Sequence, residues 1–180
     1  RAIDVLADAV GMKADEAYAL EAAALGEDID AAAWQSLAEA ADASGKGRYA
    51  VEARRQAARL RLASILGVET DEVSFGPSTT QNTYVLAQAF RQMMQPGEAV
   101  VVTNQDHEAN VGAWRRLEQD GMVIREWRID PQSGELDGAG LEGLLSERTR
   151  VVAFTHCSNI IGSMHPVGEW CEKIHAAGAI

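Results

Sequence analysis

The 180-residue sequence has little cysteine, little positive charge and no long apolar run. Two cysteines, Cys157 and Cys171, in an acidic, alanine-rich chain without a signal peptide indicate reduced thiols in a cytoplasmic protein. No apolar run approaches the roughly 20 residues that a membrane span needs. The formal net charge of -11 disfavours a nucleic-acid or anionic-membrane surface. We therefore predict a protein without nucleic-acid or membrane partners.

The two ends of the sequence suggest a segment of a longer or processed protein. It begins with Arg1 rather than Met, and a helix stop at Gly178 runs into the first residues of an apolar strand. The first 50 residues contain 17 alanines, which favour helices but supply only a thin core. We predict a helical N-terminal arm or cap over residues 1–48, with a hinge in Ser44–Gly47.

From Tyr49 onward, helical and strand patterns alternate. A helix ending at Gly67 is followed by predicted strands at Glu72–Gly76, Ala99–Thr103, Met122–Ile129 and Arg150–His156, and by predicted helices at Thr80–Met94, Asn110–Gln119, Gly140–Leu145 and Val167–Ala177. Four β-α units at this spacing predict an α/β domain over residues 49–180. Its mostly parallel sheet is flanked by helices and binds ligands at the carboxyl ends of the strands.

The loop "GPSTTQN" follows the first predicted strand and precedes a helix. Unpaired N–H groups and the helix dipole favour an anion there, and the hydroxyls of Thr79 and Thr80 can add donors, so a phosphate suits this loop. The alternative is that Ser78 or Thr79 only caps the helix. The loop lacks both the G-x-G-x-x-G pattern and the P-loop lysine, so neither nucleotide class is supported.

Two further loops contain candidate ligand contacts. In "NQDHEAN", His107 lies between two acidic residues that favour its protonated form, and its flat ring can stack on an aromatic ligand; the alternative is a surface histidine. In "HCSNIIGSMHP", Asn159 is an uncharged donor, or alternatively part of an Asx-turn. Cys171 and His175 lie four residues apart, but the spacing matches no zinc pattern, so we predict no metal site.

Taken in order, three segments resemble the class V aminotransferase family of pyridoxal-phosphate enzymes, which includes cysteine desulfurases and selenocysteine lyases. They are "VEARRQAARLRLASILGVETDEVSFGPSTTQNT", "DHEANVGAWRRL", similar to the family's EHHANxxPW, and "THCSNIIGSMHPVGEWCEKIHAAGA". The resemblance covers about Tyr49 to Ile180. It implies the N-terminal half of a fold type I large domain, truncated at its C-terminus.

The resemblance also implies roles for individual residues. Thr79 and Thr80 would hold the phosphate of pyridoxal 5'-phosphate, His107 would be a catalytic residue stacking on the pyridine ring, and Asn159 would contact the ring hydroxyl oxygen. The sequence departs from the family in three places: Gln81 replaces the usual Glu, Pro77-Ser78 replaces the usual residues ahead of the threonine pair, and Glu108 stands where desulfurases commonly have a second His.

The residues that complete the chemistry would follow this segment. The family's Schiff-base lysine and the Asp on the pyridine nitrogen come later in the chain. The lysines present are Lys13, Lys46 and Lys173, and none lies in a loop after a predicted strand. We expect Lys173 to point to water and the segment alone to be inactive.

The resemblance implies a pyridoxal-phosphate enzyme acting on an amino acid, with desulfurase-like cleavage of a C–S or C–Se bond, dimeric when intact. Transamination and epimerisation remain alternatives within the family. Outside it, the alternatives are a non-catalytic binding or oligomer-partner protein that has lost the cofactor, and a flavodoxin-like phosphate binder.

Overall fold

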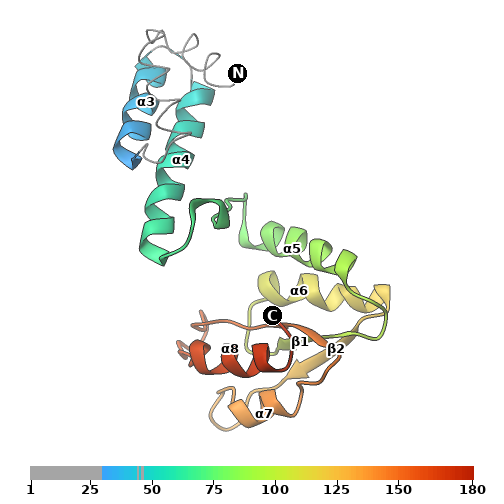
Figure 1. Cartoon of the computed structure of the whole chain (residues 1–180). Helices are drawn as coiled ribbons and strands as arrows, with labels where there is room; N and C mark the ends of the chain where they lie inside the picture. Colours follow the sequence, from blue (N-terminus) through green and yellow to red (C-terminus); the bar gives the residue numbers. More distant parts are fainter. Residues whose placement is uncertain (1–29, 44, 46) are drawn as a thin grey trace. The chain divides into compact units, whose positions relative to one another are not determined.

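The computed structural model describes residues 30–43, 45 and 47–180, and the chain forms two compact units, Arg1–Phe75 and Gly76–Ile180 (Figure 1). Most of the predicted arm over residues 1–48, and Ser44 and Lys46 of the predicted hinge, lie outside the described residues. The division predicted after residue 48 stays a prediction. The compact units divide later because the helix that begins at Gly47 packs along the helix before it.

Two α-helices make up most of the described part of the first unit. They are α3 (Ala31–Ala43) and α4 (Gly47–Leu66), and Asp30 caps α3 by accepting the N–H of Ala33 at 2.8 Å. The residues buried between the helices are mostly alanines: Leu37, Ala38, Ala41, Ala50 and Ala53. Small side chains let two helices approach closely but bury little apolar area, as the alanine content predicts.

The second unit contains a parallel three-stranded sheet in the order β2-β1-β3. Its strands are β1 (Ala99–Thr103), β2 (Val123–Trp127) and β3 (Thr149–Ala153), and both neighbours of β1 run parallel to it. Every residue of β1 is buried, as expected for a central strand covered on both faces. The predicted α/β fold with a parallel sheet flanked by helices is confirmed.

Helices cover both faces of this sheet (Figure 1). They are α5 (Thr79–Met93), α6 (Glu108–Arg115), α7 (Gly138–Glu142) and α8 (Val167–Ala176), with a 3-10 turn at Arg116–Asp120. Alternate residues of β1 point to opposite faces: Val100 and Val102 pack with α5 and α6, and Val101 packs with α7 and α8. Two separate apolar clusters therefore hold the layers together.

One predicted strand is wrong. Instead of a strand at Glu72–Gly76, the chain forms a 3-10 turn at Thr70–Glu72 followed by irregular backbone. Glu69 and Glu72 form a reciprocal capping box, with the N–H of Glu69 donating to the Glu72 carboxylate at 2.7 Å. This local hydrogen bonding takes up the backbone at the start of the predicted strand, whereas the apolar pattern of Val73 and Phe75 favours strand pairing.

Two expectations drawn from composition can be compared with the structure. Cys157 and Cys171 are free and do not form a disulfide. In the part of the chain that the structure describes, no helix has both the length and the apolar character to span a bilayer.

Candidate functional site

The sheet order places the loops after β1 and β3 side by side. The chain leaves β1 for β2 on one side and returns to β3 on the other, so the strand order reverses between β1 and β3. Open α/β sheets bind ligands outside the carboxyl ends of strands at such a point. A pocket of about 440 Å³ lies there, lined by Thr79, Asp106, His107, Ala109, Asn110, Thr155 and Asn159.

Three of the four residues predicted from the sequence line this pocket: Thr79, His107 and Asn159. They come from three loops, and 80 positions separate the first from the last. Thr80, the fourth, is exposed on the next position of α5 and is not part of the lining. Asp106, Asn110 and Thr155 also line the pocket but were not identified from the sequence.

The N-terminus of α5 is capped and still offers free donors. Ser78 is the N-cap, and its hydroxyl oxygen accepts the N–H of Gln81 at 3.2 Å. Asn82 donates its N–H to the Ser78 carbonyl at 2.9 Å. Among the described residues no acceptor faces the backbone N–H groups of Thr79 and Thr80. The cap predicted at Ser78 is therefore present and is compatible with an anion at the first two donors, which stays a prediction.

His107 is the N-cap of α6. Its Nδ1 accepts the N–H of Ala109 at 2.9 Å, so in this arrangement Nδ1 has no proton and the neutral ring has its N–H at Nε2. The expectation that the neighbouring carboxylates favour the charged form stays a prediction. The cap also fixes the orientation of an otherwise exposed ring.

Asp106 organises the same loop. One carboxylate oxygen accepts the N–H of His107 at 2.7 Å, and the other accepts the side-chain amide of Asn110. Its own N–H donates to the Thr103 hydroxyl at the end of β1, at 3.2 Å. The carboxylate is thus occupied by neighbours of its own loop. The four-residue spacing of Asp106 and Asn110 at a helix start was the sequence signal that could have identified this pair.

Asn159 lies on an irregular hairpin between β3 and α8, residues 155–166. An isolated antiparallel bridge joins Cys157 and Met164 at its base. The turn at its tip is closed by the buried Ser158, whose hydroxyl accepts the N–H groups of Ile160 and Ile161 at 3.3 and 3.4 Å. The side chain that closes the turn is therefore that of Ser158 and not that of Asn159, and Asn159 lines the pocket.

A buried polar pair lies beneath the pocket loops. The Nε2 of His165 and the Oε1 of Gln105 lie 2.6 Å apart, and the Gln105 amide donates to the Gly134 carbonyl at 2.7 Å. The His165 ring stacks on Trp170 with centroids 5.0 Å apart. Burial lowers the pKa of His165, and the negative charges of Glu135 and Asp106 offset this only in part. The pair spans 60 sequence positions, so no local pattern indicated it.

The lowered pKa of His165 gives a pH prediction. The ordinary histidine pKa is about 6.5 and the folded value is lower, so the unfolded chain binds more protons between the two values. We expect the contribution of His165 to the free energy of unfolding to be constant above about pH 6.5 and to fall as the pH drops toward the folded pKa. Urea titrations of the full-length protein between pH 5 and 8 measure this slope.

The control for this prediction compares two histidines. His165→Gln should flatten the slope between pH 5 and 7, whereas the same change at the exposed His175 should leave it in place. Glu135, Asp106 and His156 surround His165 and stay unchanged in both variants. Equal slopes in wild type and His165→Gln would contradict the prediction.

Lys173 does not point freely to water, which corrects the expectation from the sequence. Its ammonium forms ion pairs with Glu142 at 2.8 Å and with Glu169 at 3.0 Å. Hydrogen bonds to these carboxylates, first Glu142 and then Glu169, raise the pKa of Lys173. The side chain thus joins α8 to α7, away from the pocket lining. Lys13 and Lys46 lie outside the described residues.

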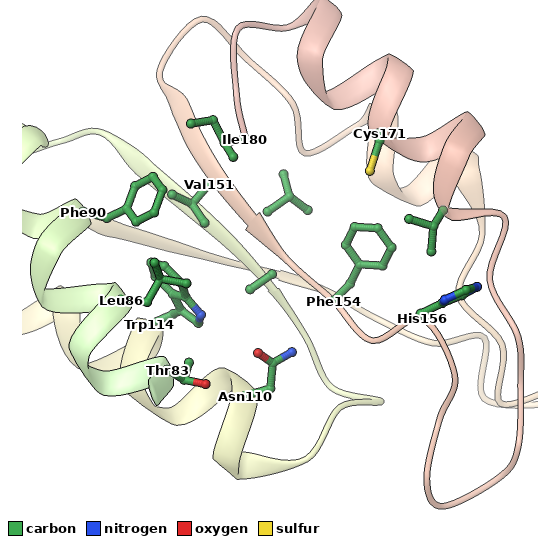
Figure 2. Close-up of a pocket in the computed structure, with 13 residues that line it drawn as sticks. Thr83, Leu86, Phe90, Asn110, Trp114, Val151, Phe154, His156, Cys171 and Ile180 are labelled. Carbon is green, nitrogen blue, oxygen red and sulfur yellow. The ribbon is translucent and has the colours of Figure 1, made fainter. Parts of the chain in front are cut away.

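A second, apolar hollow of about 350 Å³ runs along β3. In Figure 2, Phe90 and Trp114 lie on one side of it, and Phe154 and Cys171 lie on the other. Ile180 also lines it and pairs with β3, donating its N–H to Arg150 at 3.0 Å and accepting that of Val152 at 2.8 Å. Most of its lining is carbon, so it does not suit a charged ligand.

The fold and the polar pocket define an α/β domain with a candidate ligand site at the carboxyl ends of parallel strands. Within the described residues, no three His, Cys, Asp or Glu side chains cluster as a metal site would require.

Comparison with known proteins identifies the family. The model of the class-V aminotransferases matches residues 29–180, and the chain belongs to that family. Cysteine desulfurase of Serratia proteamaculans (strain 568) is 34% identical over 126 residues, which are 68% of this chain and 31% of that protein. Cysteine desulfurase of Dickeya dadantii (strain 3937) is 34% identical over 141 residues, which are 74% of this chain and 34% of that protein. The chain thus spans about a third of the length of these relatives.

Solved structures agree on the fold. The cysteine desulfurase CsdA from Escherichia coli, in an S-sulfonic acid form, superposes with a TM-score of 0.67 at 25% identity, covering 76% of this chain and 34% of that one. DndA from Streptomyces lividans gives a TM-score of 0.63 at 22% identity, and the match covers 81% of this chain and 42% of that one. At this identity the match shows likeness of fold alone.

Proposed function

We propose that the chain is part of a pyridoxal-phosphate-dependent enzyme that cleaves the C–S or C–Se bond of an amino acid, as a cysteine desulfurase does. Family membership and the relatives' names support this. The observation that carries the proposal is the gathering of Thr79, His107 and Asn159 around one pocket at the strand ends. The matched segments make up only about a third of the length of these relatives, so we propose that the complete catalytic apparatus belongs to the full-length protein.

The donors of the pocket fit the cofactor. The free N–H groups at the start of α5 and the Thr79 hydroxyl provide the geometry and partial positive charge that a phosphate needs. The His107 ring, held by its capping bond, provides a flat surface for a pyridine ring. The Asn159 amide can donate to a ring hydroxyl oxygen without adding charge. A pocket of about 440 Å³ is within the range of small-molecule sites.

In this proposal the chain's own residues bind and orient. Bound pyridoxal phosphate withdraws electrons from the substrate's Cα. Asp106 holds the backbone of His107 and the side chain of Asn110, which keeps the ring of His107 in place. Lys173, paired with two carboxylates, is not placed to hold the cofactor covalently. We propose that the lysine that binds the cofactor covalently and the Asp that pairs with the pyridine nitrogen lie in the part of the full-length protein that follows this segment.

We also propose that residues 1–48 form an arm, that residues 49–180 form half of the large domain, and that the intact protein is a cytoplasmic homodimer. Support for self-association comes from the outer side of α5, where Val85 and Met93 are 65% and 68% exposed. Exposed apolar side chains grouped on one helix are typical of an interface.

The test compares two neighbouring threonines in the full-length protein. Thr79→Val should weaken pyridoxal-phosphate binding about tenfold, because it removes a hydroxyl from the pocket wall; the matched change Thr80→Val should have a smaller effect. Cofactor dissociation constants from fluorescence titration measure both. If both variants bound the cofactor with the affinity of the wild type, Thr79 would not be part of the site. A wild-type protein that does not bind the cofactor would favour the alternative of a protein that has lost it.

A further inference from the structure

We propose that Gln105 and His165 are positioning residues that hold the Asn159 hairpin against the His107 loop and so fix the shape of the ligand pocket. The identity of the ligand rests on the proposed function, but the mechanical role of the pair does not. Neither side chain lines the pocket, so both would act through residues that do.

The pair joins the two loops that form opposite walls. Gln105 lies two positions before His107, and His165 lies at the base of the hairpin six positions after Asn159. The hydrogen bond between their side chains, at 2.6 Å, is the direct polar link between these loops. The N–H of His165 donates to the His156 carbonyl at 2.9 Å, so holding the ring also holds the hairpin base.

The loop after β2, the third loop at the carboxyl ends of the strands, is hydrogen-bonded to the same pair. Gly134, in the turn after β2, accepts the Gln105 amide. It has φ of +76°, a conformation that glycine adopts without strain. Since the Gln105 amide donates to Gly134, its oxygen is the acceptor toward His165, and His165 Nε2 is the donor. At the outer edge, the Ser163 hydroxyl donates to the Glu135 carboxylate at 2.7 Å.

Because both side chains are buried, removing either one is expected to be costly. Gln105 and His165 are each only 6% exposed, and the His165 ring is stacked on Trp170. Removing one partner leaves the other as a buried polar group without a hydrogen bond, which is costly, whereas an exposed bond is readily replaced by water. Loss of the pair should therefore loosen the hairpin, and the exposed Ser163–Glu135 bond cannot substitute for it.

Hydrogen exchange in the cofactor-free, full-length protein tests the mechanical role. His165→Phe keeps an aromatic ring on Trp170 but removes the Nε2 donor, and Gln105→Met keeps the length but removes the amide. Each should speed amide exchange in residues 156–164 about tenfold, with β1 and β2 unchanged. The double variant should be no faster than either single one. Ser163→Ala, the control at the edge, should change exchange less than twofold.

Cofactor affinity and rescue complete the test. His165→Phe should weaken pyridoxal-phosphate binding about fivefold to tenfold, and His165→Gln, which retains a donor, should recover part of the loss. Unchanged exchange in the hairpin would overturn the inference even if the wild type binds the cofactor. Faster exchange with unchanged cofactor affinity would overturn it as well, since the pair would then be only structural. Absence of cofactor binding in wild type would instead reject the proposed function, and the exchange result would still decide the mechanical role.

Discussion

Replacing Trp127 with alanine is expected to lower the free energy of unfolding by about 3–5 kcal/mol, the usual cost of removing a buried Trp or Phe side chain. Trp127 is fully buried at the end of β2. Its ring packs edge-to-face against the rings of Trp170 and Phe154, with ring centroids 4.6 Å and 5.9 Å away. Its Nε1–H donates to the Asp137 carbonyl at 3.0 Å, which fixes the start of α7. Such a loss is a large part of the stability of an ordinary domain.

Urea unfolding of the full-length protein measures this effect. Trp127→Phe is the matched variant, since it keeps most of the aromatic packing and removes the hydrogen bond to Asp137; it should cost about 1–2 kcal/mol. Glu172→Ala, at an exposed position of α8, should cost less than about 0.5 kcal/mol. A Trp127→Ala protein within about 1 kcal/mol of wild type would contradict the central place of this ring in the core.

Replacing His107 is expected to weaken pyridoxal-phosphate binding about tenfold to a hundredfold, the range of aromatic stacking on a bound ring. Two substitutions separate the stacking surface from the helix cap. His107→Ala removes both, and His107→Asn removes the ring but retains a side chain that caps helices well. Both should lose cofactor affinity to a similar extent, and only His107→Ala should also lose about 1 kcal/mol of stability.

Fluorescence titration and urea unfolding of the same full-length variants supply the two measurements. His107→Phe serves as a second control, because it restores a flat ring without a capping nitrogen and should recover affinity but not stability. If His107→Asn bound the cofactor as tightly as wild type, the ring would have only its capping role.

Sequence patterns predicted the elements that bury an unbroken apolar run or end on a clear stop. Strand β1 was predicted with the bounds it has, since five consecutive apolar or β-branched residues leave little choice of central strand. Helix α5 was predicted within one residue, because Ser78 and the Pro96–Gly97 stop frame it. The strand at Glu72–Gly76 failed because two glutamates three residues apart hydrogen-bond each other's backbone. Apolar alternation could not reveal that competition.

The candidate site divides in a similar way. Thr79, His107 and Asn159 could be selected because each follows a strand or begins a helix, and the sheet brings such positions together. Gln105 and His165 could not be selected from the sequence, since their contact depends on the strand order and on the course of a hairpin. The capping bond that Nδ1 of His107 accepts from Ala109 was missed for a related reason, since it depends on how the backbone turns into α6.

The strand order also sets the cost in chain entropy of assembling the pocket. Ala99 of β1 pairs with Val123, 24 positions later, and with Thr149, 50 positions later. Closing a loop of twice the length costs about 0.6 kcal/mol more, because a longer flexible chain has more arrangements to lose. The two walls of the pocket follow β1 and β3, so forming the pocket requires the β1–β3 pairing. This pairing costs more chain entropy than the β1–β2 pairing. A chain in which only β1 and β2 have paired has His107 at the end of a formed strand while Asn159 has no fixed position beside it.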